Sequence, residues 1–121
     1  MMNSTRTPIN RLTLTEVYCS LQVEGTHCWP ECPIPEVDYL RFPHRHMFHI
    51  KAYKKVSHSD RDVEFIKLKQ EITTYIQNAY PLGKFGSMSC EMLAHELIMN
   101  FSLSRCDVSE DNENGAIVTV M

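Results

Sequence analysis

The chain has 121 residues, of which 43% are hydrophobic and 22% are charged, as is usual for a globular domain. Its formal net charge is −3 and no stretch concentrates lysine and arginine, which argues against a nucleic-acid-binding surface. The lack of an apolar run of about 18 residues argues against a membrane span. Five cysteines, an odd number, favour a reducing compartment, so we expect a cytoplasmic protein.

The chain begins with a polar stretch that is followed by an alternating pattern. Residues 1–10 have neither an apolar core nor a small-residue cleavage site, so we expect no signal peptide but a flexible N-terminus. A single domain is expected over residues 11–121. Within residues 12–27 apolar and polar side chains alternate, which predicts a half-buried strand with His27 in the apolar phase at its end.

A proline-rich segment separates this strand from a second one. Residues 28–43 contain four prolines and are predicted to be a long loop of about sixteen residues, neither helix nor central strand. Loops of this length in compact domains are often functional. Residues 44–56 alternate again, with His44, His46 and Phe48 on one face and His49 on the other.

The pattern then changes to a helical period. A first amphipathic helix is predicted to start at a cap on Ser59 or Asp60 and to end at Pro81 and Gly83, and a second covers residues 89–101. Two more strands, residues 103–110 and 116–121, flank the hairpin dipeptide at residues 114–115. Three cysteines are predicted to be buried as small hydrophobic residues: Cys19, Cys90 and Cys106.

The order of elements is therefore ββααββ, which predicts an α+β fold. We expect a four-stranded antiparallel sheet with both helices on one face. Its open edges suggest closure by oligomerisation.

Three histidines of the two strands are candidate metal ligands. Side chains two residues apart on a strand point the same way, about 6.6 Å apart, so His44 and His46 can reach one ion. His27, at the end of the neighbouring strand, can supply a third imidazole. Three imidazoles with an open position are typical of a catalytic Zn²⁺. A rival zinc site would use His27 with Cys28 and Cys32, but no second cysteine pair completes it.

Five segments resemble the 6-pyruvoyltetrahydropterin synthase and 6-carboxytetrahydropterin synthase family, in the family's order. The two histidine segments look like its zinc motifs, in which a strand ends in histidine and the next begins with His-Gly-His. The others look like its first helix, the start of its second helix and its last hairpin. The segments are VEGTH (residues 23–27), HRHMF (44–48), VEFIKLK (63–69), MSCEMLA (88–94), and VSE with GAI (108–110 and 115–117).

The resemblance implies a tunnelling fold, in which ββααββ subunits join their sheets into an oligomeric barrel. The expected partners are a pterin or purine-like small molecule and further copies of the chain, as a trimer or hexamer. Glu110 stands at the family's ring-anchoring glutamate, where a carboxylate accepts two parallel N–H bonds from the ring. Glu91 matches the family's helix-start glutamate and is a second substrate-binding candidate, or alternatively a charge that the helix N-terminus favours.

The chain departs from the family pattern at three places. Leu40 stands where the family has its catalytic cysteine, and residues 80–87 lack the family's Asp-His pair. Arg45 replaces the glycine between the two histidines and brings a large cation near the expected site. Cys28 or Cys32 on the proline-rich loop would then be the catalytic group that moves protons.

The sequence therefore supports three hypotheses. The first is a divergent zinc lyase acting on dihydroneopterin triphosphate or a related pterin, in the biosynthesis of pterins or of 7-deazaguanines such as queuosine. The second is a non-catalytic zinc module that binds a pterin, purine or nucleotide. The third is a metal-free structural oligomer.

Overall fold

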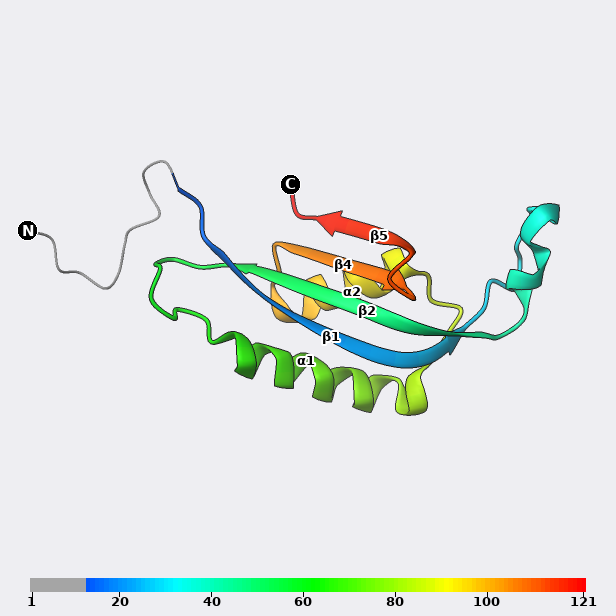
Figure 1. Cartoon of the computed structure of the whole chain (residues 1–121), viewed down its shortest axis with the longest axis horizontal. Coiled ribbons are helices and arrows are strands. Elements are labelled where there is room, and N and C mark those ends of the chain that lie inside the picture. Colours follow the sequence, from blue (N-terminus) through cyan, green and yellow to red (C-terminus); the bar gives the residue numbers. More distant parts are fainter. Residues whose placement is uncertain (1–12) are drawn as a thin grey trace, which may run out of the picture.

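The computed structural model describes residues 13–121, so the expected flexible N-terminus over residues 1–10 lies outside the described residues. A twisted sheet runs the length of the molecule (Figure 1). Its strands are β1 (Glu16–His27), β2 (His44–Lys55), β3 (Lys84–Gly86), β4 (Arg105–Glu110) and β5 (Asn114–Thr119). They lie in the order β3-β1-β2-β4-β5, and every neighbouring pair is antiparallel except β1 with β3.

Both α-helices cover the same face of this sheet. Helix α1 (Phe65–Ala79) packs on β1, and α2 (Cys90–Phe101) packs on β4 and β5 (Figure 1). Their apolar sides join the inward-facing residues of the strands in one hydrophobic core, which drives the two layers together. The largest fully buried side chains of this core are Phe48, Ile50, Ile72, Ile76, Leu93, Leu97, Cys106 and Val108.

The two long strands confirm the predicted alternation. On β1 the side chains of Cys19 and Leu21 are buried and those of their neighbours are exposed, and on β2 the buried phase includes Phe48. The antiparallel register pairs His27 with His44 at the end of the ladder. The alternation therefore fixes which face each histidine side chain occupies.

The α+β class is confirmed, but the expected four-stranded antiparallel sheet is wrong in detail, because the short strand β3 adds a parallel edge. Two glycines allow the chain to approach β1 there. A Cβ on Gly25 would lie 2.5 Å from the Gly83 carbonyl oxygen, and Gly83 has a φ of +68° that favours glycine. Periodicity does not reveal a three-residue strand of this kind.

Each of the two α-helices begins at a side-chain cap. Ser89 caps α2 by accepting a hydrogen bond from the Met92 N–H at 3.1 Å. The cap expected for α1 at Ser59 or Asp60 is wrong. The Glu64 side chain instead accepts from the Lys67 N–H at 2.9 Å, and the helix begins later.

The proline-rich segment was expected to be a loop without a helix, and this expectation is wrong in part. The segment contains η1 (Pro35–Arg41), a 3₁₀ helix interrupted by the non-helical backbone of Val37. Pro35 stands at the start of this helix, where a missing N–H removes no helical hydrogen bond. The proline rule therefore excludes the interior of a helix but not its first position.

The predicted hairpin turn lies a few residues earlier than the Asn-Gly dipeptide. Asn114 pairs with Glu110 as part of β5, so the turn consists of residues 111–113. Asp111 and Asn112 take positive φ values of 56° and 58°, which these residue types tolerate. Gly115 lies in the strand, where a Cβ would collide with the Val108 carbonyl oxygen.

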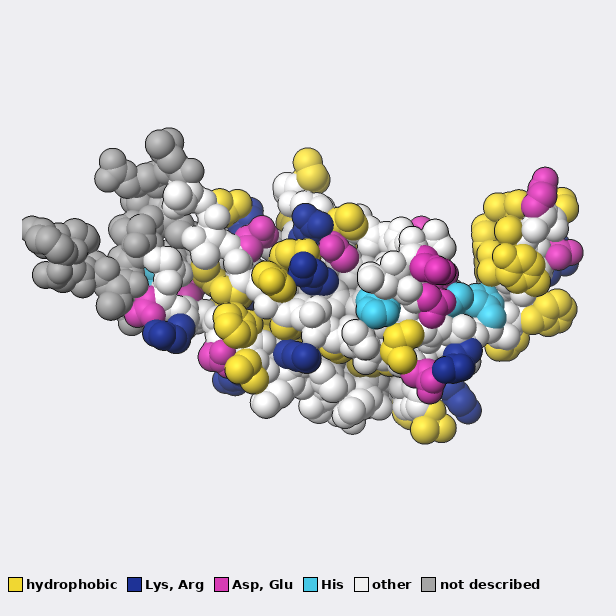
Figure 2. All heavy atoms as spheres, in the orientation of Figure 1, with side chains coloured by type: hydrophobic (Ala, Val, Ile, Leu, Met, Phe, Trp, Pro, Cys, Tyr) yellow, Lys and Arg dark blue, Asp and Glu magenta, His cyan; other side chains and the backbone are white. Residues whose placement is uncertain are grey.

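The segment between β1 and β2 projects from the end of the sheet and carries exposed apolar side chains (Figures 1 and 2). Those exposed by 43% or more include Trp29, Ile34, Tyr39 and Phe42. None of the helices in the described part of the chain has the length and apolar run that a membrane span requires.

Candidate metal centre

Four side chains from three strands meet where the projecting segment joins the sheet. His27 ends β1, His44 and His46 begin β2, and Glu110 ends β4. One ligand atom of each lies within 4.8 Å of all the others. In the part of the chain that the structure describes, this is the one group of at least three histidine, cysteine or acidic side chains that could hold a metal ion.

Backbone carbonyls orient two of the imidazoles. The Nδ1 of His27 lies 2.8 Å from the Met88 oxygen, and the Nδ1 of His44 lies 2.9 Å from the Phe42 oxygen. A carbonyl oxygen only accepts, so each Nδ1 carries the proton and each Nε2 presents a lone pair. Strand β3 helps to place the first carbonyl, because its Gly86 oxygen accepts from the Cys28 N–H at 2.8 Å.

A carboxylate orients the third imidazole. The Nδ1 of His46 lies 2.7 Å from Asp111 Oδ2, and the Met47 N–H donates to Asp111 Oδ1 at 2.9 Å. The Met47 N–H and, after it, the His46 ring lower the pKa of the Asp111 carboxyl below its ordinary value, which keeps it ionised. All three Nδ1 atoms are therefore engaged on the side away from the cluster.

The Nε2 atoms of His27 and His46 are buried and have no hydrogen-bond partner. Glu110 is near both: its Oε2 lies 2.9 Å from His27 Nε2, and its Oε1 lies 3.5 Å from His46 Nε2. These contacts have the distance of an ion pair without the alignment of a hydrogen bond. Buried nitrogens left without a partner are costly, at about 1–3 kcal/mol each.

The side chains of this cluster fit a metal ion. Converging imidazole nitrogens with a carboxylate oxygen are a ligand set that Zn²⁺ accepts, and an ion would satisfy both unpartnered Nε2 atoms. Phe48 lies beneath the rings, with its ring centroid 5.1 Å from that of His27 and 5.8 Å from that of His46. The centre therefore has an apolar floor, which excludes water from that side.

A pocket of about 470 Å³ opens beside the centre. His27, His44 and Glu110 form one side of it, and Glu91 at the start of α2 lies on its wall. This volume lies in the range of small-molecule sites. Leu40 also lines the pocket and offers only apolar contact.

The two cysteines predicted as catalytic groups, Cys28 and Cys32, lie in different environments. Cys28 lines the pocket and is partly exposed. Cys32 is 1% exposed and is not among the pocket residues; its Sγ faces the carbonyl oxygens of Ile34 and Val37, at 3.8 Å and 3.7 Å. Cys32 therefore stabilises the loop, and neither cysteine belongs to the metal group.

Two features of the site differ from what the sequence indicated. Arg45 points away from the centre and pairs with Glu24 at 2.6 Å, because alternate residues of a strand face opposite sides. Cys90, predicted only as a core residue, also lines the pocket, with its Sγ 3.8 Å from Glu110 Oε2. Burial and then Glu110 raise the pKa of the Cys90 thiol to about 12, so it stays protonated at neutral pH.

The sequence pattern predicts no role for Asp111, although its carboxylate contacts His46. Asp111 follows Glu110 in a turn rich in acidic and amide residues, which reads as an ordinary exposed turn. The available signal was its place beside a candidate ligand, because histidine ligands commonly donate their other N–H to a carboxylate.

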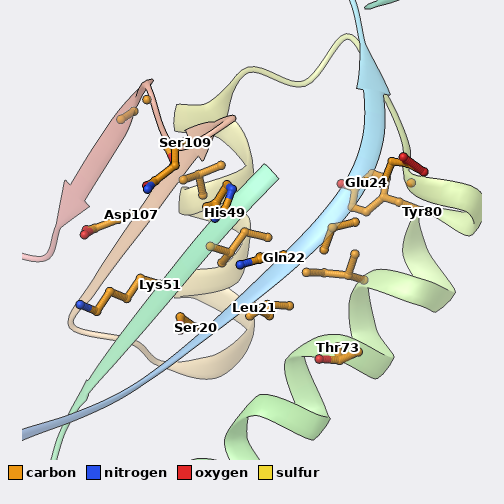
Figure 3. A pocket seen from close by; sticks show the side chains of 18 of the residues that line it. Ser20, Leu21, Gln22, Glu24, His49, Lys51, Thr73, Tyr80, Asp107 and Ser109 are labelled. Carbon is orange, nitrogen blue, oxygen red and sulfur yellow. The ribbon is translucent and has the colours of Figure 1, made fainter. Parts of the chain in front are cut away.

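A larger hollow of about 1240 Å³ lies along β1, β2, β4 and α1 and includes none of the three histidines of the candidate metal centre. Polar side chains of β2 and β4 line part of it, with His49 opposite Ser109 and Lys51 opposite Asp107 (Figure 3). His49 thus faces away from the metal centre, as its phase in the strand predicts.

No protein-family model matches this chain, and no curated protein matches it in sequence.

Proposed function

We propose that this chain is a zinc-dependent lyase of the tetrahydropterin synthase type, acting on dihydroneopterin triphosphate or a related pterin. The observation that carries the proposal is the convergence of imidazole nitrogens beside a pocket of about 470 Å³. An ion held there would face a cavity of the size that a bicyclic ring needs. The resemblance of the two histidine segments supplies the substrate class and the assignment to pterin or 7-deazaguanine biosynthesis.

In this proposal His27, His44 and His46 hold Zn²⁺ and leave one position open for the substrate, while the Glu110 carboxylate beside them is kept for the substrate ring. Zinc at this place would polarise the hydroxyl and carbonyl groups of the substrate side chain. The chain's own residues bind and orient the substrate. Glu91, on the pocket wall, and Glu110 offer carboxylates to the N–H groups of the ring, and Leu40 contacts its apolar face.

Cys28 is the thiol that this proposal assigns to proton transfer. It lines the pocket next to His27 and is partly exposed, whereas Cys32 is buried inside the loop and Cys90 keeps its proton. A proton can therefore move between substrate and protein at the Cys28 sulfur without a rearrangement of the core.

The test combines metal analysis with turnover. Purified protein should contain one zinc per chain, and should convert dihydroneopterin triphosphate to a product resolved by chromatography. His44→Ala should lose both the metal and turnover, while Cys28→Ala should keep zinc and lose turnover. Cys32→Ala is the matched control, because it removes a thiol from the same loop outside the pocket and should keep turnover. Protein with stoichiometric zinc that leaves the pterin unchanged would contradict the lyase proposal.

A second candidate function is a zinc-containing module that binds a pterin, purine or nucleotide without chemistry. Leu40 favours it, because the position of the family's catalytic cysteine carries an inert side chain on the pocket wall. Calorimetric binding of a pterin to zinc-loaded protein, together with absent turnover, would support this second function.

A further inference from the structure

The turn between β4 and β5 carries Asp111, whose carboxylate contacts the Nδ1 atom of His46 on the side away from the candidate metal centre. Asp111 makes three hydrogen bonds to two adjacent residues of β2. Its Oδ2 lies 2.7 Å from His46 Nδ1, its Oδ1 accepts from the Met47 N–H at 2.9 Å, and its own N–H donates to the Met47 oxygen at 2.7 Å. Both oxygens of the carboxylate are thus held in one orientation relative to the imidazole.

This orientation decides which nitrogen of His46 carries the proton. An ionised carboxylate has no hydrogen to donate, so the imidazole must donate from Nδ1, and Nε2 is left with a lone pair that faces the cluster. The negative charge also makes the imidazole a better donor to a metal. We propose that Asp111 is a positioning residue that sets the tautomer of His46 and so makes it a metal ligand. The inference rests on the metal centre of the proposed function.

His46 differs in this respect from the other two histidines. His27 and His44 are oriented by the backbone oxygens of Met88 and Phe42, which no side-chain substitution removes. Only His46, among the three, has its tautomer set by a side chain. A single substitution at Asp111 can therefore reverse the tautomer while the ligand itself stays in place.

The matched variant is Asp111→Asn. Its amide oxygen can still accept from the Met47 N–H, which turns the amide NH₂ toward His46 Nδ1. Nδ1 must then accept, and the proton moves to Nε2, where it blocks metal binding. The variant should keep the turn intact, because asparagine tolerates the φ of +56° at this position.

We expect Asp111→Asn to weaken zinc binding by about 10- to 100-fold, measured by competition with a chromophoric chelator. Asp111→Ala should weaken it less, because water can accept from Nδ1 in place of the carboxylate. Glu113→Gln is the control: it removes one negative charge from the same exposed turn, outside the partners of the three histidines, and should change affinity less than about twofold. A purely structural role predicts the opposite order, with asparagine better than alanine.

Two further measurements keep the inference separate from the proposed function. Long-range ¹H–¹⁵N NMR spectra of the metal-free protein should show the Nδ1–H tautomer of His46 in the wild type and the Nε2–H tautomer in Asp111→Asn. Urea denaturation of the metal-free forms should give similar unfolding free energies. If the wild type binds no zinc, the metal centre fails, while the NMR spectra still decide whether Asp111 sets the tautomer. Equal zinc affinity of wild type and Asp111→Asn, or an unchanged tautomer, would overturn the inference.

Discussion

Zinc should raise the melting temperature of this protein, because the metal-free centre contains unfavourable contacts. Two imidazole nitrogens, on His27 and His46, are buried without a hydrogen-bond partner. Each such atom costs about 1–3 kcal/mol in the folded state, and a metal ion would relieve the cost of both. The unfolded chain has no such preformed site, so zinc binds the folded state preferentially.

The size of the effect follows from binding linkage. Free zinc at about 100 times its dissociation constant stabilises the folded state by about 2.7 kcal/mol. For a domain of this length, about 1 kcal/mol corresponds to roughly 4 °C, so the melting temperature should rise by about 10 °C. Any zinc binding by the five cysteines in the unfolded chain would reduce the shift, so this value is an upper bound.

Differential scanning calorimetry with chelator, with zinc and with magnesium measures the effect. Magnesium should have little influence, because it prefers oxygen ligands. A variant carrying His44→Ala and His46→Ala keeps every cysteine and should lose the zinc-dependent shift. The reasoning would be refuted if chelator and zinc gave the same melting temperature, or if the double variant showed the full shift.

Two predictions concern groups outside the ligand set. Mass spectrometry of the folded protein treated with iodoacetamide at neutral pH should show that Cys28 is labelled before Cys106. Cys106 is fully buried, and burial raises the pKa of its thiol to about 12. Faster labelling of Cys106 would contradict the described core. Burial and a hydrogen bond to Glu96 raise the pKa of the Tyr80 phenol. The stabilisation from this group is complete below the unfolded pKa of about 10 and is lost as pH rises through the folded pKa. Urea denaturation should therefore show wild type losing stability relative to Tyr80→Phe as the pH rises above about 10; a constant difference would argue against this.

The alternating pattern of the two long strands was enough to predict most of what positions the centre. His27 lies in the apolar phase of β1, and His44 and His46 share a phase of β2, so their common face follows from a period of two. Each helix was located because its buried side chains recur at helical spacing, as Leu93 and Leu97 do on α2. These features depend on neighbours within one element, which a sequence pattern records directly.

What the sequence did not reveal depends on contacts between distant segments. Strand β3 forms because Gly25 and Gly83 let two backbones approach closely, and neither residue signals this alone. Asp111 contacts His46 although 65 residues separate them. Glu110 was expected to hold a ring, yet its carboxylate also reaches the histidine nitrogens, and only the pairing of β4 with β2 places it there.

The pairing of His27 with His44 in the ladder has a consequence for how this domain can change. The two residues are direct partners across β1 and β2, so their separation is set by the sheet and not by the segment that connects them. That segment supplies Trp29 and Leu40 to the pocket wall. Its length and composition between Trp29 and Leu40 can therefore vary while the ladder keeps His27 and His44 together, provided that the Phe42 carbonyl that orients His44 stays in place. Changes in this part of the pocket wall could therefore alter which small molecule fits the pocket, while the candidate metal ligands keep their places on the paired strands.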